Sequence, residues 1–268
     1  MRARRVALIG FGAIAGDLAA ALLAAESPVY GLGVLLRPGS AARERVPEPV
    51  ALLSDAAELA AFRPDLVVEA AGHEAVRSVV PACLEQGLPV LVSSIGALHD
   101  AALLARLTDA ARASGGRLIL PSGALGALDY VRALRAAKAL SLSYESRKPP
   151  SAWREELLRL GHDPDRLDGP VTLFSGTARD AAAAYPQNLN VAAALALAGP
   201  GFEAVEVAVI CDPQATGNGH AVAAESEFGR MRIEIVNTPS PTNPKTSWIV
   251  GQSLLAAIVQ HFSPVIML

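Results

Sequence analysis

Short apolar runs alternate with amphipathic stretches through the first 122 residues of the chain. The apolar runs are predicted strands, at residues 5–9, 29–36, 66–69, 89–92 and 117–120. Helical periodicity lies between them, over residues 13–25, 73–85 and 99–113. Because the strands are apolar on both sides, they predict an α/β fold, with a parallel sheet covered by helices on both faces.

The pattern changes after residue 122. A helix over 125–138 leads into further predicted strands, at 139–146, 171–175, 204–211, 220–228 and 231–236, with a helix over 189–198 among them. The last two strands alternate apolar and polar residues and meet at Gly229, which predicts an antiparallel hairpin. This region is therefore predicted to be a second, α+β domain with a mixed sheet.

A final helix is predicted to start near Lys245, after Pro241, Asn243 and Pro244. We expect it to return to the first domain. The expected boundaries are therefore 1–122 with 243–268 for the first domain and 123–242 for the second. The second domain is expected to bind the substrate and to form a homodimer through its sheet.

Composition narrows the class of protein. The chain has 268 residues, of which 51% are hydrophobic and 18% charged, so it can bury two full cores. The net charge of −3 comes with no basic run, and nucleic-acid binding is not expected. Since no uninterrupted apolar stretch of ~18 residues occurs, a membrane span is not expected either.

The cysteines and the N-terminus bear on the compartment. Cys83 and Cys211 lie far apart without CxxC spacing, so we expect no disulfide framework, no metal site and a reducing cytoplasm. Arginines ahead of the apolar stretch 6–15 also permit a secretion signal as an alternative. Asp17 directly after that stretch, and the strand–helix pattern that continues from it, favour the cytoplasmic interpretation.

The most specific local signal is a GxGxxA fingerprint between the first strand and the first helix. Gly10 permits a tight turn, Gly12 lets the backbone approach a pyrophosphate, and Ala15 lets the helix pack close to the strand. Ala13 and Ile14 open the helix, where N–H groups and the helix dipole favour phosphate. The fingerprint predicts a Rossmann-type domain that binds NAD or NADP; the alternative is an ordinary glycine-rich turn.

The end of the second strand bears on the choice of cofactor. An acid at this position usually bonds the ribose 2′-hydroxyl, but here the strand ends in Leu35, Leu36 and Arg37. An arginine there can accept a 2′-phosphate, so NADP is expected alone or together with NAD. The alternative is that Arg37 is only a solvated loop residue.

Loops after the later strands are expected to line the cofactor crevice. Their small residues fit a backbone that runs close to a ligand, although tight packing would also explain them. The candidate contacts in these loops are Ala71, Gly72 and Ser94.

His220 is the strongest candidate for proton transfer. It follows Gly217, Asn218 and Gly219 at the start of a predicted strand in the second domain. Imidazole titrates near neutrality, which suits proton transfer coupled to hydride transfer. The alternative is an ordinary histidine on a hairpin.

Two helix starts carry polar clusters that fit a small anionic substrate. Asn188 and Asn190 place amides at one of them. Lys245, Thr246 and Ser247 place a cation and two hydroxyls at the other, which would suit a carboxylate. Helix capping alone would also explain these residues.

At these residues the sequence resembles the L-aspartate dehydrogenase family over nearly the whole chain. The segments that carry the resemblance are GFGAIA (10–15), VEAAGH (68–73), SSIGA (93–97), PSGALGALD (121–129), YPQNLNV (185–191), GNGH (217–220) and NPKTS (243–247). The later segments are more specific than the glycine loop, because generic dinucleotide-binding folds do not share them.

The resemblance implies oxidative deamination of L-aspartate to iminoaspartate with NAD or NADP. Iminoaspartate can feed NAD synthesis or hydrolyse to oxaloacetate and ammonia. The resemblance also implies that His220 is catalytic and that Ala124 and Asn190 contact the cofactor. We expect aspartate to lie between the domains, with its carboxylates held by the Lys245 cluster and Lys148.

Two alternatives stay open. One is a reductase similar to homoserine dehydrogenase or dihydrodipicolinate reductase. The other is a redox sensor that binds the dinucleotide without turnover, which would leave the His220 and Asn190 segments unexplained.

Overall fold

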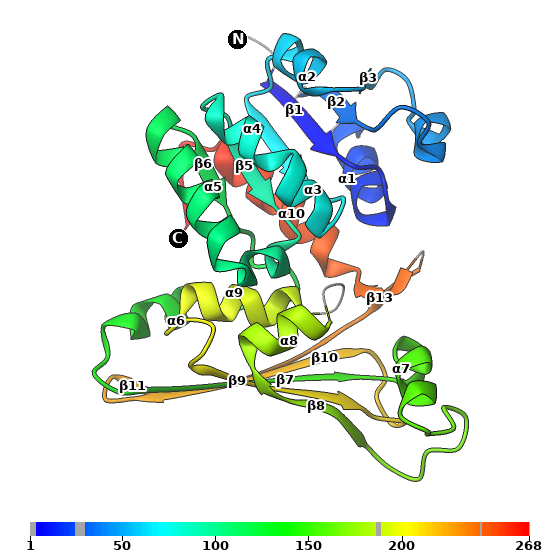
Figure 1. Ribbon diagram of the computed structural model, residues 1–268, viewed down its shortest axis with the longest axis vertical. Helices are drawn as coiled ribbons and strands as arrows, with labels where there is room; N and C mark the ends of the chain where they lie inside the picture. Colours follow the sequence, from blue (N-terminus) through cyan, green and yellow to red (C-terminus); the bar gives the residue numbers. More distant parts are fainter. Residues whose placement is uncertain (1–3, 25–29, 186–188, 242, 268) are drawn as a thin grey trace. The chain divides into compact units, whose positions relative to one another are not determined.

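The computed structural model describes residues 4–24, 30–185, 189–241 and 243–267. The chain divides into two compact units (Figure 1). Unit 1 comprises residues 1–123 and 251–268, and unit 2 comprises residues 124–250.

Unit 1 contains a six-stranded sheet in the order β3-β2-β1-β4-β5-β6. Every pairing in it is parallel. The strands are β1 (Arg4–Ile9), β2 (Tyr30–Leu35), β3 (Ala51–Leu53), β4 (Leu66–Glu69), β5 (Pro89–Val92) and β6 (Arg117–Ile119). The chain leaves β1 towards β3 and then returns to β4 on the other side, so the strand order reverses between β1 and β4. Ligands of such sheets bind at this switch point, beyond the carboxyl ends of the strands.

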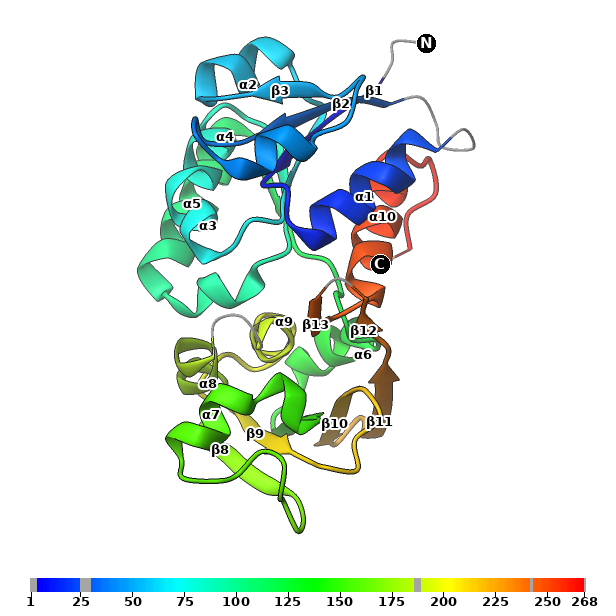
Figure 2. The same cartoon turned by 90° about the vertical axis from the view of Figure 1, so that its right-hand side faces the viewer.

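Helices cover both faces of this sheet, as its apolar strands predict. They are α1 (Ala13–Leu23), η1 (Ala41–Arg45), α2 (Ala56–Phe62), α3 (His73–Ser78), α4 (Val80–Glu85), η2 (Ile95–His99), α5 (Ala101–Ser114) and α10 (Ile249–His261). Figure 2 shows α1 beside α10 on one face and α3, α4 and α5 on the other. Leu18 of α1 and Leu254 and Ile258 of α10 share one buried cluster with Val6 and Leu8 of β1.

Unit 2 contains a five-stranded mixed sheet in the order β11-β10-β7-β9-β8. Its strands are β7 (Leu140–Lys148), β8 (Val171–Thr177), β9 (Val205–Cys211), β10 (Asn218–Ser226) and β11 (Gly229–Asn237). Strands β7 and β9 are parallel, and the other pairs are antiparallel. The α/β class, the parallel sheet, the second mixed sheet and the hairpin at Gly229 are thus confirmed.

One face of the second sheet is covered by helices. The helical segments of unit 2 are α6 (Leu128–Ala133), η3 (Leu134–Ala136), η4 (Pro150–Ala152), α7 (Arg154–Arg159), α8 (Ala178–Ala184) and α9 (Asn190–Ala198). Figure 1 shows α6, α8 and α9 together over this face. Side chains alternate along β7 with the strand period, so Leu142, Tyr144, Ser146 and Lys148 are all buried on it.

Two predicted helices differ from the structure. The helix expected over 73–85 is two helices, α3 and α4, because Pro81 has no N–H and its ring excludes a continuous turn. The final helix does not start near Lys245. Residues 243–247 form strand β13 (Asn243–Ser247), paired with β12 (Pro239–Ser240), and α10 begins at Ile249.

The physical reason for the second difference lies in the prolines of this segment. A residue before proline is biased towards extended backbone, which disfavours a helical Asn243. The hairpin supplies the alternative, since Ser247 pairs with Pro239 and the Trp248 N–H donates to the Thr238 carbonyl at 2.9 Å. Within the described ranges, no helix combines the length and apolar character that crossing a bilayer would need.

Candidate active site

The glycine loop lies between the end of β1 and the start of α1. Gly10 has φ +91°, and a Cβ there would lie 2.6 Å from the Cβ of Ala71 and 3.3 Å from the Ala70 carbonyl oxygen. Only glycine allows the loop after β4 to come this close. A Cβ at Gly12 would instead meet nothing within 4 Å, so the backbone there faces open space.

The start of α1 fits a phosphate group. Gly12 is its N-cap residue, and it has no side chain with which to bond the first N–H groups, which include those of Ala13 and Ile14. The first turn also carries no acid that would repel an anion. An open backbone at Gly12 together with an uncapped helix start is what a dinucleotide pyrophosphate requires.

Glu69, at the carboxyl end of β4, organises the loops beside this position. Its side chain is fully buried. Its Oε1 accepts the N–H groups of Ala71 and Gly72, both at 2.8 Å, and the hydroxyl of Ser94 at 2.9 Å. Its Oε2 accepts the Ser94 N–H at 3.0 Å. One carboxylate therefore fixes the loop after β4 to the loop after β5.

The three residues held by Glu69 are the predicted cofactor contacts of these loops. Sequence reasoning did not single out Glu69 itself. Its signal was a charged residue closing the otherwise apolar strand Leu66–Glu69. A buried carboxylate at that position needs several donors, and backbone N–H groups of a turn supply them.

Arg37 follows β2 and is exposed. No acid ends this strand, and the guanidinium of Arg43 donates to the Leu36 carbonyl at 2.9 Å. Positive charge thus surrounds the end of β2, which is compatible with a 2′-phosphate. The role of Arg37 in cofactor choice stays a prediction.

In unit 2, His220 lies at the start of β10 on the helix-covered face of the sheet. It is 4% exposed, and its Nδ1 is 2.8 Å from the hydroxyl of Tyr144 on β7. The two rings are nearly parallel, with centroids 6.0 Å apart. Tyr144 therefore fixes the orientation of the imidazole and directs the other ring nitrogen, Nε2, away from the tyrosine.

Burial, and secondly the charge of Lys148, lower the pKa of His220 from 6.5 to about 4. The imidazole is therefore neutral at neutral pH and has a nitrogen that can accept a proton. Burial likewise raises the pKa of Tyr144, so its hydroxyl stays protonated. Tyr144 was not singled out from the sequence, although the strand period of β7 places it on the buried face.

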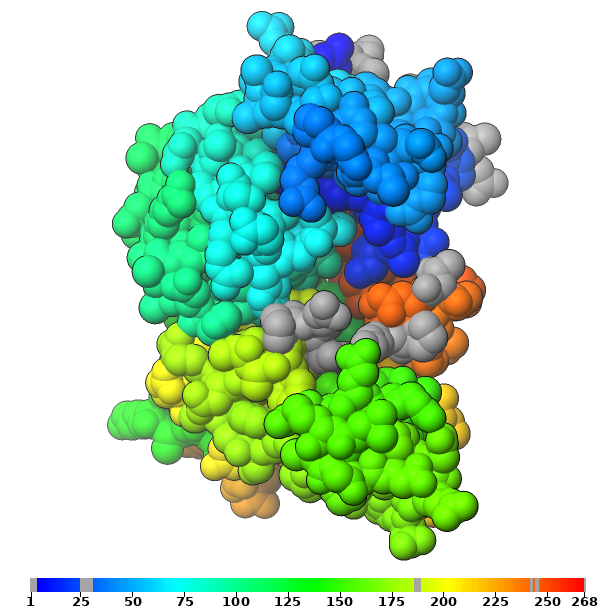
Figure 3. Space-filling model, turned by 45° about the vertical axis from the view of Figure 1, so that its right-hand side comes forward, coloured from blue at the N-terminus to red at the C-terminus, as the bar shows by residue number. Residues whose placement is uncertain are grey.

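Lys148 ends β7 on the same face and is 3% exposed. Its ammonium lies 5.5 Å from the centroid of the Trp153 ring, which is also buried. The segment of η4 and α7 that carries Trp153 follows directly after this strand, and Figure 3 shows it in bright green on the surface of unit 2. A buried cation beside a neutral imidazole suits a substrate that carries a carboxylate.

Two further polar side chains lie on this face near His220. Ser146 and Asn218 are fully buried. The Ser146 hydroxyl, both amide atoms of Asn218 and the Nε2 of His220 have no hydrogen-bond partner in the described part of the chain.

Ala124 and Asn190, the cofactor contacts that the family resemblance implies, also belong to unit 2. The Ala124 carbonyl accepts the side-chain amide of Asn237 at 2.9 Å, and Asn190 is the first residue of α9. Asn188 lies outside the described residues. In the predicted polar cluster of Lys245, Thr246 and Ser247, the Thr246 hydroxyl accepts a hydrogen bond from the side-chain amide of Asn243 at 3.2 Å.

The Lys245 cluster is therefore not a helix start. Lys245, Thr246 and Ser247 belong to β13, and Ser247 is buried. A carboxylate bound there would not meet the N–H groups of a helix end, so the dipole argument for this site does not hold. The hydroxyls of Thr246 and Ser247 remain candidates as side chains, and the side chain of Lys245 lies outside the described part of the chain.

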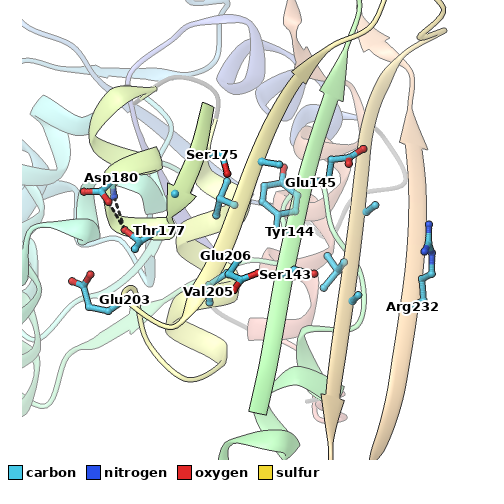
Figure 4. Close-up of a pocket in the computed structure, with 16 residues that line it drawn as sticks. Ser143, Tyr144, Glu145, Ser175, Thr177, Asp180, Glu203, Val205, Glu206 and Arg232 are labelled. Carbon is cyan, nitrogen blue, oxygen red and sulfur yellow. Dashed lines mark hydrogen bonds between the residues drawn. The ribbon is translucent and has the colours of Figure 1, made fainter. Parts of the chain in front are cut away.

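A groove of about 700 Å³ crosses the other face of the second sheet (Figure 4). Outward-facing side chains line it, among them Ser143, Glu145, Glu206 and Arg232. His220, Lys148, Ser146 and Asn218 do not. Tyr144, which contacts His220, is among the residues that line this groove, but His220 itself is not, and we do not assign the chemistry to it.

Comparisons with known proteins match both parts of the chain. Residues 10–121 match the family model described as homoserine dehydrogenase, NAD binding domain. Residues 129–261 match the model described as aspartate dehydrogenase, C-terminal. His220 and its neighbours on β7 and β10 thus lie in the part that matches the more specific model.

Individual proteins match over nearly their full length. L-aspartate dehydrogenase 2 of Bordetella bronchiseptica is 50% identical over 259 residues, which cover 97% of this chain and 97% of that protein. L-aspartate dehydrogenase of Ruegeria pomeroyi is 48% identical over 259 residues, 96% of this chain and 92% of that protein. The crystal structure of aspartate dehydrogenase from Thermotoga maritima has a TM-score of 0.77 and 26% identity, and covers 98% and 99% of the two chains.

Proposed function

This chain belongs to the L-aspartate dehydrogenase family, and on that premise we propose that it oxidises L-aspartate to iminoaspartate with NAD or NADP. The observation that carries the proposal is His220, a buried imidazole that is neutral and oriented by Tyr144, within a chain 50% identical to an L-aspartate dehydrogenase. Iminoaspartate is then available for NAD synthesis or hydrolyses to oxaloacetate and ammonia.

The cofactor would be held by unit 1. Gly10 and Gly12 leave the backbone open, Ala13 and Ile14 present N–H groups, and the Glu69-bound loops supply Ala71, Gly72 and Ser94. Arg37 would meet the 2′-position of the adenosine ribose. Ala124 and Asn190 of unit 2 are further proposed contacts. When bound, the nicotinamide accepts the hydride that leaves the substrate.

His220 would remove the proton that blocks the reaction. The ammonium group of aspartate must become neutral before its lone pair can form the C=N bond as hydride leaves Cα. In the tautomer with the hydrogen on Nδ1, that N–H donates to the Tyr144 hydroxyl and Nε2 accepts the proton. Substrate carboxylates near the imidazole would offset the charge of Lys148 and raise the pKa of His220 towards the range of an effective base.

Lys148 is the proposed partner of one substrate carboxylate. Its ammonium is buried on the same face as His220, and its charge acts on the imidazole, so a carboxylate bound beside His220 would also meet this cation. Lys245, Thr246 and Ser247, together with Asn188, are retained as candidates for the other carboxylate.

The assay that tests the function mixes L-aspartate with NAD, and separately with NADP, at alkaline pH and follows absorbance at about 340 nm. We expect turnover with L-aspartate and none with L-alanine. Turnover of homoserine or of an aldehyde instead would identify the related reductases. Tight dinucleotide binding without consumption of NADH by oxaloacetate and ammonia would identify a sensor.

We also propose a homodimer, which assembles through the face of the second sheet that no helix covers. Side chains of both signs, such as Glu145 and Arg232, line its groove, and Val236 is 67% exposed on the edge strand β11. Light scattering of the purified chain tests this proposal, and a monomer at micromolar concentration would contradict it. The cytoplasm stays the proposed compartment.

A further inference from the structure

Three buried polar side chains lie together on the helix-covered face of the second sheet, and each has at least one polar atom without a hydrogen-bond partner in the described part of the chain. They are Ser146 on β7 and Asn218 and His220 on β10. The unpartnered atoms are the serine hydroxyl, both polar atoms of the asparagine amide and the Nε2 of the histidine. Burial raises the pKa of Tyr144, and the Ser146 hydroxyl lies close enough to that of Tyr144 to oppose this rise, although it makes no hydrogen bond in the described part of the chain. The side-chain amide of Asn218 and the Nε2 of His220 lack a described partner altogether.

The register of the sheet places them side by side. His220 lies directly opposite Ser146 in the antiparallel pair of β10 and β7, and Gly219 lies opposite Arg147. Asn218 is two residues from His220 along β10, so both side chains leave the same face. The three groups therefore form one continuous polar surface, hereafter the unpartnered triad.

The backbone around Asn218 is closely packed. A Cβ on Gly217 would lie 2.6 Å from the carbonyl oxygen of Asn237 on β11. A Cβ on Gly219 would lie 3.1 Å from the carbonyl oxygen of Arg147 on β7. The backbone on both sides of Asn218 thus packs closely against β7 and β11, which restrains its position.

A second asparagine gives an internal reference. Asn237 is directly opposite Asn218 in the β10–β11 pair, and it is nearly as buried. Its amide donates to the Ala124 carbonyl, so it has the partner that Asn218 lacks. A buried polar atom without a hydrogen bond destabilises the folded state. Such atoms are retained where they bind a ligand.

We propose that Ser146 and Asn218 are substrate-binding residues that hydrogen-bond the amino-acid head group, the α-amino and α-carboxylate groups, of the small acidic substrate. The serine hydroxyl and the asparagine Nδ2 donate to the carboxylate, and the asparagine Oδ1 accepts an N–H of the amine. The inference rests on the proposed function, because it places the head group beside the nitrogen that removes its proton.

The head group, rather than the side-chain carboxylate, is assigned here because of His220. Its Nε2 must reach the α-amino group, and Ser146 and Asn218 are its neighbours on the same face. Lys148, two residues beyond Ser146 on β7, lies level with Asn218 in the same antiparallel register, so the side-chain carboxylate of a four-carbon diacid is assigned to it while Ser146 and Asn218 hold the head group.

The test uses the full-length protein and two variants, Ser146→Ala and Asn218→Leu. Each removes buried polar atoms; Ser146→Ala makes a small change in volume, and Asn218→Leu keeps the branched shape of the side chain but enlarges it. We expect KM for L-aspartate to rise about tenfold or more, as for a lost hydrogen bond to a charged group. The melting temperature should not fall, because an unpaired buried polar group is replaced by an apolar one. KM for the dinucleotide should not change.

Ser143→Ala is the matched control, since Ser143 lies on the same strand and lines the groove on the opposite face. It should leave KM for L-aspartate unchanged. Unchanged KM in Ser146→Ala and Asn218→Leu would overturn the inference, as would a fall in melting temperature without a change in KM. If Asn218→Leu does not fold, the KM for L-aspartate and the melting temperature of Ser146→Ala are sufficient to test the inference.

The outcome separates this inference from the proposed function. A wild-type protein that does not oxidise L-aspartate refutes the function itself. A wild-type protein that does so, with variants of normal KM, refutes only the role of the triad.

Discussion

The two units bury polar groups in opposite ways. In unit 1, Glu69 is fully buried and every described contact of its carboxylate is a hydrogen bond to Ala71, Gly72 or Ser94. In unit 2, Ser146, Asn218 and the Nε2 of His220 are buried without a partner. The first arrangement contributes to stability and shapes loops. The second is unfavourable for folding and is explained by a ligand.

This difference predicts which measurement each substitution affects. Removing a partnered group leaves its donors unpaired, so the free energy of unfolding falls. Removing an unpartnered group leaves no other polar group without its hydrogen bond. The free energy of unfolding should therefore stay the same, while substrate binding or turnover changes. His220 combines the two cases, because one ring nitrogen is bonded to Tyr144 and the other is not.

The largest effect is expected for His220→Ala. Losing the proton acceptor should lower kcat by about 10²–10⁴-fold, which is the usual contribution of a general base. NADH titration by fluorescence should show unchanged dinucleotide affinity, because the cofactor-holding loops belong to unit 1. Turnover close to that of the wild type would exclude His220 as the base.

Glu69→Ala tests the opposite case. Four hydrogen bonds from three residues would be lost, and the free energy of unfolding should fall by about 3–4 kcal/mol in urea titrations. The dinucleotide dissociation constant should also rise, because the two loops are no longer joined.

Glu85→Ala is the matched control for Glu69. Glu85 is exposed and lies 4.0 Å from Arg106, so its loss should change the unfolding free energy by less than about 1 kcal/mol. Equal effects of the two substitutions would contradict the role given to Glu69.

Stability should depend on pH through His220. Its pKa is about 4 in the folded protein and 6.5 without burial, so the unfolded chain binds more protons between these values. The stabilisation is complete above pH 6.5 and is lost as pH falls towards 4, by up to about 3 kcal/mol.

Urea unfolding of the wild type and of His220→Asn across that range measures this loss. The variant should show a weaker dependence on pH. The pKa of His73 is also lowered to about 4, mainly by burial. Because His73 is present in both proteins, its contribution cancels when the pH dependence of the variant is subtracted from that of the wild type. Parallel curves would show that the imidazole of His220 is not buried in solution.

The smallest expected effect belongs to Tyr144→Phe. The variant loses the hydrogen bond that orients His220, so kcat should fall about three- to tenfold and the pH–rate profile should shift, while KM for the dinucleotide stays constant. Tyr130→Phe, at a half-exposed position of α6, should change neither quantity. An unaltered pH–rate profile in Tyr144→Phe would mean that the tyrosine only packs against the ring.

Local chemistry in the sequence was sufficient for the fold class and for the main candidates. Apolar runs predict five of the six parallel strands of unit 1 but not the short β3, and the glycine spacing predicts the turn at Gly10. His220 was identified from a family segment and its place at a strand start. The pattern failed near Lys245, where capping residues were given more weight than the bias of Asn243 towards extended backbone.

Only the tertiary structure decided which polar side chains form hydrogen bonds, and with which residues. Glu69 and Ser94 are 25 residues apart in the sequence, and Tyr144 and His220 are 76 apart. Whether a polar side chain finds a partner depends on which strands become neighbours and in what register, and no local pattern specifies that. Two buried asparagines on adjacent strands therefore look alike in the sequence, although Asn237 is bonded and Asn218 is not.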